Sequence, residues 1–442
     1  MVYAPAAGRG WRTPWIVYTA AAVAYFVAVT HRTALGVAGI EATRRFGLSA
    51  TGLAAFSVVQ LAVYAAMQIP AGRLLDRFGP RALIATGSLL MASGQLVLAL
   101  AHDVPTALIA RVLIGAGDAG IFISALRVVA DWFPPRRVPV MVQITGVIGQ
   151  SGQLASAIPV AFLLHTRGWT ATFGTLAAAG LLASAGAFVG IRDPAPRRDA
   201  QSVQRFGPAV RRTVRTAGTR LGFWSHFAAP FSANVVGMLW GVPFFLSAQG
   251  CTPAQASLLL TVLTLSAMVT GPIVGRLTAR HPLRRSWIVL GSCALTAAAW
   301  VALLLPSTPR PMWQLLVFVV VIGAGGPVSL VGMDFARTWS PASTLGTASG
   351  FVNTGGFIST IGSVLAVGVV LQVVSPPGAT TYTLDAYRLA FTVLAVPWAI
   401  GIAGVLRSRH LTRADMRAAG VVVPPIQEVL RRKHTTSDDD QA

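Results

Sequence analysis

Four ionisable residues lie inside long apolar stretches of this sequence, at His31, Arg32, Arg111 and Asp118. A charged side chain in hydrocarbon costs several kcal/mol, and residues of this kind usually mark the path of an ion or a ligand. Asp118 follows Arg111 by seven residues, which on a helix is two turns and roughly 10 Å along the same face. Because a buried acid beside an arginine can be poised to load and release a proton, we expect proton binding at Asp118.

The other three residues suggest related chemistry. An imidazole titrates near neutral pH, so His31 is a second candidate for proton binding. Arg32 lies six residues before the end of its predicted helix and Arg111 six residues after the start of its own, each roughly 9 Å deep, so the two can share one level. A guanidinium group binds a carboxylate through two parallel hydrogen bonds, which predicts an anionic ligand at Arg32 and Arg111. The alternative is a static ion pair that holds helices together.

The elements that must position these residues are membrane-spanning helices. Of the 442 residues, 54% are hydrophobic and 11% are charged, which does not suit a solvated surface. About 20 apolar residues cross a hydrocarbon core. We predict an all-α membrane protein with about twelve transmembrane helices, at 15–38, 50–71, 82–101, 105–130, 138–164, 170–190, 223–247, 255–275, 286–305, 312–337, 344–372 and 387–406.

Short motifs recur between the two halves of the chain. Gly72-Arg73-Leu74 returns as Gly275-Arg276-Leu277, and Ile114-Gly115-Ala116-Gly117 returns as Ile322-Gly323-Ala324-Gly325. Landmarks that recur at one offset indicate two halves that share a fold. We therefore predict an N-terminal segment at 1–14, six-helix bundles at 15–190 and 223–406, a linker at 191–222 and a tail at 407–442.

The net charge of +21 reflects membrane topology better than nucleic-acid binding, because the arginines form short clusters between apolar runs. We place 27 of the 35 Lys and Arg residues in the N-terminal segment, the even-numbered loops and the tail, so both termini are predicted to be cytoplasmic. The first apolar run is long enough to be a retained helix and not a signal peptide. The excess of arginine over lysine suggests a bacterial plasma-membrane protein, which we expect to function as a monomer in the lipid bilayer.

The segment from Gly72 to Arg81 resembles the signature between helices 2 and 3 of the major facilitator superfamily, and Arg111, Gly115 and Gly117 resemble its helix 4 motif. The resemblance covers about residues 15–406 and implies a secondary transporter that works by alternating access. An ion-pair cluster at the inner ends of the helices is expected to lock the outward-open state. The motif residues of this cluster are Gly72, Asp76, Arg77, Gly79, Arg81 and Asp131. The alternative is a basic loop that only fixes the topology.

A narrower resemblance is to the anion:cation symporter family. His31-Arg32, the segment from Phe46 to Thr51, and Tyr64 with Gln68-Ile69-Pro70 carry it, and the segment from Gly346 to Asn353 adds to it. The family moves organic anions such as sugar acids and carboxylates, often with protons, and has an arginine and an acid seven residues apart in helix 4, usually a glutamate. The resemblance adds Tyr64, Trp240 and Asn353 as weaker substrate-binding candidates. Snorkelling at helix ends accounts for Arg127 and Asp334.

Other functions fit less well. A drug or metabolite exporter of the same fold remains the alternative, although exporters favour a Gly-Pro pair in helix 5 where this chain has Gly149-Gln150. A receptor would be expected to add a soluble sensing domain. No metal-ligand spacing, P-loop or hydrolase elbow is present, and the GxGxxG match at Gly115–Gly120 lies inside an apolar helix, so we expect no enzyme, no metal and no cofactor. Cys251 and Cys293 are expected to be bystanders.

Overall fold

The computed structural model describes residues 12–47, 50–193, 206–376 and 381–421. Most of the predicted N-terminal segment, residues 194–205 of the predicted linker and residues 422–442 of the predicted tail lie outside these ranges. Every regular element in the described ranges is a helix.

The N-terminal half holds two helices that fold back on themselves. Both α3 and α7 contain a glycine with a left-handed backbone, Gly79 (φ 80°) and Gly168 (φ 76°), which divides each into two helices. The predicted helices 2 and 3, and likewise 5 and 6, are therefore joined by a single-glycine break with no longer loop. The elements are α1 (Arg12–Val37), α2 (Gly39–Phe46), α3 (Ala50–Leu100), α4 (Val104–Asp118), α5 (Ile121–Trp132), α6 (Val138–Ala155), the π-helical turn η1 (Ser156–Val160) and α7 (Ala161–Gly190).

The C-terminal half follows the same order with more irregular turns. Two π-helical turns interrupt its first membrane helix, and a 3-10 segment, η5, interrupts its fourth. The elements are α8 (Phe206–Arg215), α9 (Ala217–Ala228), α10 (Phe231–Val235), η3 (Val236–Trp240), α11 (Gly241–Pro243), η4 (Phe244–Ala248), α12 (Pro253–Arg280), α13 (Arg285–Leu304), α14 (Met312–Gly325), η5 (Gly326–Leu330), α15 (Val331–Trp339), η6 (Ala342–Thr344), α16 (Leu345–Val374), α17 (Leu384–Thr392) and α18 (Ala395–Ala418).

Ten helices in the described residues are long and apolar enough to cross a membrane. Two of them span 43 and 53 residues, more than twice the length that a bilayer needs, and these contain the breaks at Gly79 and Gly168. The described chain therefore provides twelve membrane-spanning segments, as predicted. The first membrane helix of the C-terminal half begins at Ala217, before the predicted residue 223, and α18 continues to Ala418, beyond the predicted residue 406.

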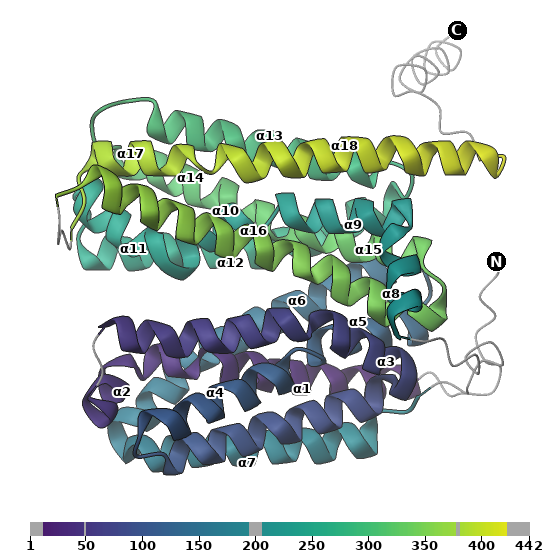
Figure 1. Cartoon of the computed structure of the whole chain (residues 1–442), viewed down its shortest axis with the longest axis horizontal. Helices are drawn as coiled ribbons and strands as arrows, with labels where there is room; N and C mark the ends of the chain where they lie inside the picture. Colours follow the sequence, from purple (N-terminus) through teal and green to yellow (C-terminus); the bar gives the residue numbers. More distant parts are fainter. Residues whose placement is uncertain (1–11, 48–49, 194–205, 377–380, 422–442) are drawn as a thin grey trace, which may run out of the picture.

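The two six-helix bundles lie side by side, one formed by α1–α7 and the other by α9–α18 (Figure 1). The start of α1 and the end of α18 lie at the same end of the molecule, which we call the terminal side. The helices α2, α11 and α17 lie at the other end, which we call the distal side. Leu182 and Val189 are 74% and 79% exposed on the outer surface, as expected for side chains that face lipid.

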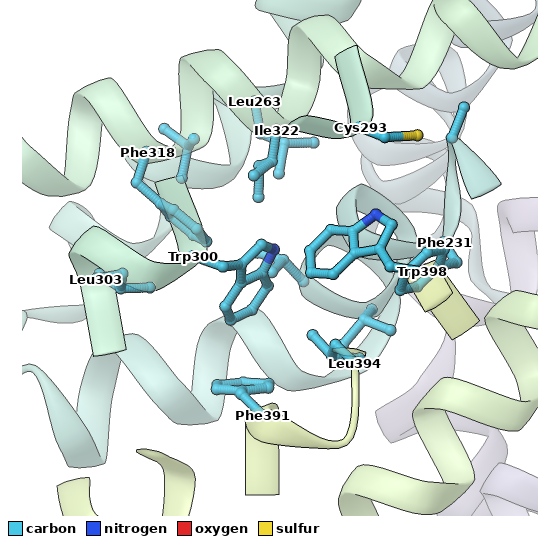
Figure 2. Packing of buried hydrophobic residues seen from close by; sticks show 14 of the residues in the cluster. Phe231, Leu263, Cys293, Trp300, Leu303, Phe318, Ile322, Phe391, Leu394 and Trp398 are labelled. Carbon is cyan, nitrogen blue, oxygen red and sulfur yellow. The ribbon is translucent and has the colours of Figure 1, made fainter. Parts of the chain in front are cut away.

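Buried apolar clusters hold each bundle together, and one of them continues into Met333, Ala336, Ala348 and Val352 of the C-terminal half. In the C-terminal bundle, Phe231, Trp300, Phe391 and Trp398 pack in one cluster (Figure 2), and the indole nitrogen of Trp300 donates a hydrogen bond to the Ser232 hydroxyl at 2.7 Å. Close packing of this kind lets each bundle move as a unit.

The bundles meet in backbone contact near the terminal side, where α3 crosses α16. A Cβ atom added to Gly72 would lie 2.4 Å from the Gly346 carbonyl oxygen, and one added to Gly350 would lie 2.1 Å from the Gln68 carbonyl oxygen. Only glycine permits this approach, which membrane helices use to associate without a hydrophobic driving force. In the described structure the terminal side is therefore closed between these helices.

Candidate functional site

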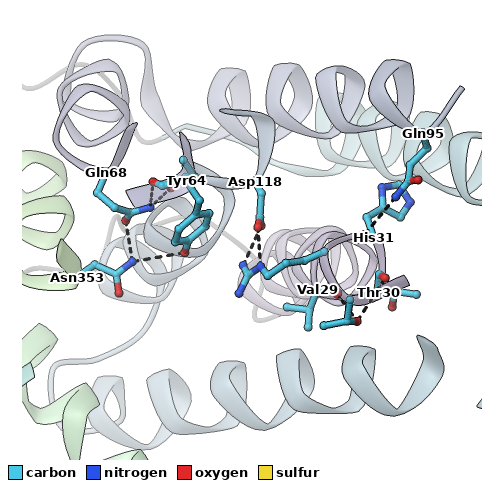
Figure 3. Close-up of polar contacts among 11 residues, drawn as sticks. Val29, Thr30, His31, Tyr64, Gln68, Gln95, Asp118 and Asn353 are labelled. Carbon is cyan, nitrogen blue, oxygen red and sulfur yellow. Dashed lines mark hydrogen bonds and ion pairs between the residues drawn. The ribbon is translucent and has the colours of Figure 1, made fainter. Parts of the chain in front are cut away.

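Arg32 of α1 and Asp118 of α4 form a bidentate ion pair inside the N-terminal bundle (Figure 3). The Arg32 Nε atom donates to Asp118 Oδ2 at 2.5 Å and its Nη2 atom donates to Oδ1 at 2.9 Å. The Asp118 side chain is 0% exposed, whereas the Arg32 side chain is 23% exposed. The Asp118 carboxylate is thus fully buried, whereas part of the Arg32 side chain that binds it is accessible.

The helix that carries Asp118 ends at that residue. The next helix, α5, begins at Ile121, so Ala119 and Gly120 interrupt the membrane span. An interruption frees backbone carbonyls that must find other donors inside a membrane. Gln68 supplies such a donor, because its Nε2 atom donates a hydrogen bond to the Ala119 carbonyl oxygen at 3.3 Å.

The Tyr64 ring contacts the Arg32 guanidinium beside its ion pair with Asp118. The Arg32 guanidinium carbon lies 4.8 Å from the centre of the Tyr64 ring, a cation–π contact, and the Tyr64 ring packs 4.8 Å from that of Phe357 in the C-terminal half. A planar guanidinium on an aromatic face keeps its orientation, so the remaining donors of Arg32 point in a fixed direction.

Asn353 of α16 connects this cluster to the C-terminal half. Its Nδ2 atom donates to Gln68 Oε1 at 2.7 Å and to the Tyr64 hydroxyl at 3.4 Å. Figure 3 shows Tyr64, Gln68 and Asn353 together on one side of Asp118, with His31 on the other side. The structure thus brings four predicted site residues together from both halves: Arg32, Tyr64, Asp118 and Asn353.

Two adjoining cavities lie between the bundles. One, of about 220 Å³, is lined by Arg32, and the other, of about 360 Å³, is lined by Asn353 and His226. They share the lining residues Gln150, Gln153, Gly326, Pro327 and Ser329. The two cavities thus adjoin, with Arg32 at the first and the amide of Asn353 and the imidazole of His226 at the second, a mixture of apolar walls and a few polar groups that suits a small anion with further hydrogen-bonding groups.

Three other predicted site residues lie away from this space. Arg111 is 2% exposed, and its Nε atom donates to the Phe56 carbonyl oxygen at 3.4 Å. His31 is 0% exposed and packs beside Gly180 inside the N-terminal bundle. Trp240 donates to the Val364 carbonyl oxygen at 3.0 Å and packs against Tyr382 and Tyr387. None of these three lines either of the two cavities.

His226 is a cavity residue that the sequence analysis did not single out. It lies on α9, is 7% exposed, and its Nδ1 atom lies 2.9 Å from the Ser329 carbonyl oxygen. The sequence feature that could have identified it is a histidine four residues into the predicted membrane helix 223–247, close to the start of that helix. The second half therefore contributes an ionisable group to the cavity, and not only apolar walls.

On the terminal side, Asp76 of α3 binds the first turn of α16. Its carboxylate accepts hydrogen bonds from the Gly346 and Thr347 backbone N–H groups at 2.7 and 2.8 Å and from the Thr347 hydroxyl at 2.6 Å. The N-terminus of a helix offers unpaired N–H groups and a partial positive charge, which stabilise a carboxylate. The predicted motif residues Gly72 and Asp76 thus both hold α3 against α16.

Arg127 joins this contact to Asp131. Its Nε atom donates to Asp131 Oδ2 at 2.7 Å, its Nη1 atom donates to the Ala342 carbonyl oxygen at 2.6 Å, and Nη1 lies 3.9 Å from Asp76. Arg127 therefore connects the two halves, beyond the snorkelling expected from its sequence position. Asp334, its counterpart in the second half, pairs with Arg337 at 2.9 Å.

Two further motif residues, Gly79 and Arg81, lie against Asp193, which follows α7. The Arg81 backbone N–H donates to Asp193 Oδ1 at 3.1 Å, and a Cβ atom on Gly79 would come within 2.9 Å of this carboxylate. Burial raises the pKa of the Asp193 carboxyl, and the hydrogen bond from Arg81 opposes the rise. Arg77 is exposed, with its guanidinium 5.1 Å from the Phe78 ring. Arg81 thus meets Asp193 and Asp131 meets Arg127, where one shared cluster was expected.

Metal binding finds no support in the part of the chain that the structure describes. No three His, Cys, Asp or Glu side chains gather there in a way that could hold an ion. The chemistry of the site is that of ion pairs, amides and an imidazole.

Comparisons with known proteins agree with this architecture. A sequence model of the Major Facilitator Superfamily matches residues 21–246 and 222–434. The chain is 28% identical over 181 residues to the "Probable L-galactonate transporter" of Escherichia coli K12, covering 40% of each chain. It is also 28% identical over 186 residues to the "Probable sulfoacetate transporter SauU" of Cupriavidus necator, covering 41% of this chain and 43% of that one. The matches thus span about two fifths of the length of these relatives.

The fold itself matches a solved structure over nearly its whole length. The transporter FucP, in the outward conformation, superposes with a TM-score of 0.68 at 14% identity, over 90% of this chain and 99% of that one. The match to the family covers both six-helix halves, and the relatives are transporters. This chain is therefore a multi-pass membrane protein that belongs to the Major Facilitator Superfamily.

Proposed function

We propose that this transporter moves a small organic anion together with a proton, by alternating access between the two bundles. The observation that carries the proposal is the bidentate pair of Arg32 and Asp118 at the edge of the cavity. The names of the relatives, which refer to L-galactonate and sulfoacetate, support an organic anion as substrate.

The pair couples the two ligands through competition. Arg32 has one planar fork, which binds either the Asp118 carboxylate or a carboxylate of the substrate. Protonation of Asp118 removes the charge that holds Arg32, so the guanidinium becomes free to bind the anion. Proton binding and anion binding then favour each other, which is the thermodynamic requirement for symport.

We infer that the direction is uptake, because the proton gradient across a bacterial plasma membrane is directed inward. The glycine crossing and the Asp76 contact close the terminal side, and the charge distribution predicts that this side is cytoplasmic. The cavity would then receive substrate from outside the cell, and a proton gradient directed inward would drive uptake across a bacterial plasma membrane.

The geometry also sorts the predicted residues by role. Arg32, Tyr64 and Asn353 surround the anion in this proposal, and Asp118 carries the proton. Arg111 holds α4 against α3 through the Phe56 carbonyl oxygen, and so positions Asp118 from a distance. We assign no substrate contact to Trp240 and no primary coupling role to His31. Tyr64 and Asp118 contact the cavity residues Arg32 or Asn353, whereas Trp240 packs against Tyr382 and Tyr387 and His31 packs beside Gly180.

Transport into proteoliposomes tests the proposal. A panel of labelled sugar acids, carboxylates and sulfonates is offered under an imposed pH gradient, acidic outside, with liposomes that contain the Arg32→Gln variant as the control. We expect accumulation of at least one anion above its equilibrium level, and collapse of that accumulation on addition of a protonophore. Export of neutral or cationic compounds from the same liposomes, without anion uptake, would instead support the exporter.

A further inference from the structure

A third pocket lies in the C-terminal bundle, at the terminal side of the molecule. Its volume is about 70 Å³, and it is lined by residues of α9, α13, α15 and α18 and of the loop that precedes α13. Figure 1 shows α13 and α18 along the edge of this bundle that faces away from the N-terminal bundle. The pocket is therefore separate from the two cavities between the bundles and from the proposed path of the transported anion.

Three arginines line this pocket: Arg285, Arg409 and Arg413. Arg285 is 6% exposed and its Nη1 atom donates to the Thr338 hydroxyl at 2.8 Å, but its buried Nε atom has no hydrogen-bond partner in the described part of the chain. The Nε atom of Arg409 is buried and has no partner among the described residues either. Because buried polar groups nearly always have partners, two unpaired guanidinium N–H groups at one pocket indicate an acceptor from outside the chain.

The nearby acids do not supply this acceptor. Asp334 of α15 is paired with Arg337 at 2.9 Å, and neither residue lines the pocket. The two segments that flank the pocket, 276–286 and 407–417, contain eight arginines and one acid, the exposed Asp415. The surroundings of the pocket therefore carry a large excess of positive charge, which favours an anionic ligand.

The donors of the pocket suit a phosphate group. Its several oxygens can accept hydrogen bonds from two guanidinium groups at once, and arginine recognises phosphate through parallel hydrogen bonds. The Arg409 guanidinium carbon lies 4.4 Å from the centre of the Trp287 ring, a stacking contact that holds the plane of its donors. The hydroxyl group of Ser286 also lines the pocket. Since a cavity of about 10–15 Å³ holds one water molecule, this pocket has room for a group of several atoms.

Apolar side chains beside the pocket favour a lipid as the source of the phosphate. Leu283, which lines the pocket, is 49% exposed, and Trp287 and Leu406, on the two helices that flank it, are 44% and 47% exposed. Tryptophan is enriched where a membrane helix passes from hydrocarbon to the headgroup layer. Basic pockets between membrane helices at this depth bind the headgroups of anionic lipids.

We propose that this pocket binds the phosphate of an anionic phospholipid, with Arg285 and Arg409 as its main ligands and with the acyl chains against Leu283 and Trp287. The bound lipid bridges α13 and α18 and stabilises the C-terminal bundle, because a ligand that binds the folded state shifts unfolding to higher temperature. The binding does not depend on the transported anion. Only the assignment of the lipid to the cytoplasmic leaflet rests on the proposed orientation.

Lipid binding to the purified, delipidated full-length protein tests the proposal. Native mass spectrometry measures the Kd of phosphatidylglycerol and of phosphatidylcholine, and thermal unfolding in the same detergent measures the Tm with each lipid. We expect phosphatidylglycerol to bind more tightly and to raise the Tm further. Arg285→Gln and Arg409→Gln should each raise its Kd roughly tenfold, because each loses a charge-assisted hydrogen bond. Arg409→Gln keeps the contact between Arg285 and Thr338, so it tests the site even if Arg285→Gln does not fold.

The matched control is Arg407→Gln, which removes the same charge from an exposed position on α18 outside the pocket. At high salt, where attraction between exposed charges is screened, its Kd should stay within about twofold of wild type. An equal loss in Arg407→Gln, or an unchanged Kd in Arg409→Gln, would overturn the proposal. Soluble glycerol 3-phosphate that displaces phosphatidylglycerol at equal concentration would show a site for free phosphate and would overturn the lipid assignment. No transport is measured, so the result is separate from that of the proteoliposome assay.

Discussion

Arg32 holds Asp118 through two hydrogen bonds, of 2.5 and 2.9 Å, while its own side chain remains 23% exposed and its guanidinium stacks on Tyr64. The arginine thus has one side committed to the acid and one side open to the cavity. In the proposed function this shared arginine is what makes proton binding and anion binding depend on each other.

Arg32→Lys should weaken anion binding although the positive charge is kept. A lysine ammonium is a point charge that cannot form the parallel pair of hydrogen bonds or the flat contact with Tyr64. Loss of one charge-assisted hydrogen bond, about 1.5 kcal/mol, corresponds to at least a tenfold rise in Kd. Titration calorimetry measures the Kd of the anion for each variant, with Arg388→Lys on the distal side as the control. An unchanged Kd would remove Arg32 from the binding site.

Asp76→Asn should favour opening of the terminal side. The amide keeps one acceptor but loses the charge that interacts with the N-terminus of α16, worth about 1 kcal/mol or roughly a fivefold shift in population. The buried Ser349, replaced by cysteine in a chain without Cys251 and Cys293, reports opening through its alkylation rate. Arg77→Gln is the control because Arg77 is exposed. Equal rates in both variants would show that Asp76 does not stabilise closure.

Gly346→Ala should also favour opening of the terminal side, because the added methyl group clashes with α3. The added Cβ atom would lie 2.4 Å from the Gly72 carbonyl oxygen and 2.8 Å from Asp76 Oδ1, so α3 and α16 must separate. Overpacking of this kind costs about 1–3 kcal/mol. We expect faster alkylation at position 349 and slower transport. Gly174→Ala, which has nothing within 4 Å of its Cβ position, should behave as wild type. Wild-type behaviour of Gly346→Ala would contradict the close crossing.

Trp240→Phe should lower thermal stability without changing the apparent affinity for the anion. Its indole donates to the Val364 carbonyl oxygen and packs among Tyr382 and Tyr387, away from the two cavities. The variant loses the indole hydrogen bond and part of the ring packing, and the hydrogen bond alone contributes about 0.5–1.5 kcal/mol. A fall in Tm with KM within twofold of wild type is expected. A rise in KM at unchanged Tm would return Trp240 to the substrate site.

The sequence predicts the architecture well because hydropathy and length are local properties. The twelve spans, the two halves and the place of Gly72 and Asp76 in a segment that resembles the superfamily signature can all be read from consecutive residues. The breaks at Gly79 and Gly168 cannot, because an apolar run gives no sign of whether two helices are separated by a loop or by one glycine.

The partners within the site are harder to predict, because they depend on how helices rotate against one another. Asp118 and Arg111 share a face of α4, yet Asp118 pairs with Arg32 while Arg111 reaches the Phe56 carbonyl oxygen. The partners of Asp76 are mainly backbone N–H groups of α16, which leave no trace in side-chain patterns. His226 could not be singled out from the sequence because its place in the cavity depends on tertiary contacts such as that with Ser329, which is 103 residues away.

The most direct test of the shared arginine is proton uptake during anion binding, measured with a pH indicator in weakly buffered detergent solution. A transported anion is added to the wild type, to Asp118→Asn and to the control Asp385→Asn, which changes an exposed acid on the distal side. The account predicts that the wild type and the control take up a proton as the anion binds, and that Asp118→Asn binds the anion with loss of that uptake and with an affinity that no longer weakens as pH rises. Proton uptake of wild-type size in Asp118→Asn would contradict it.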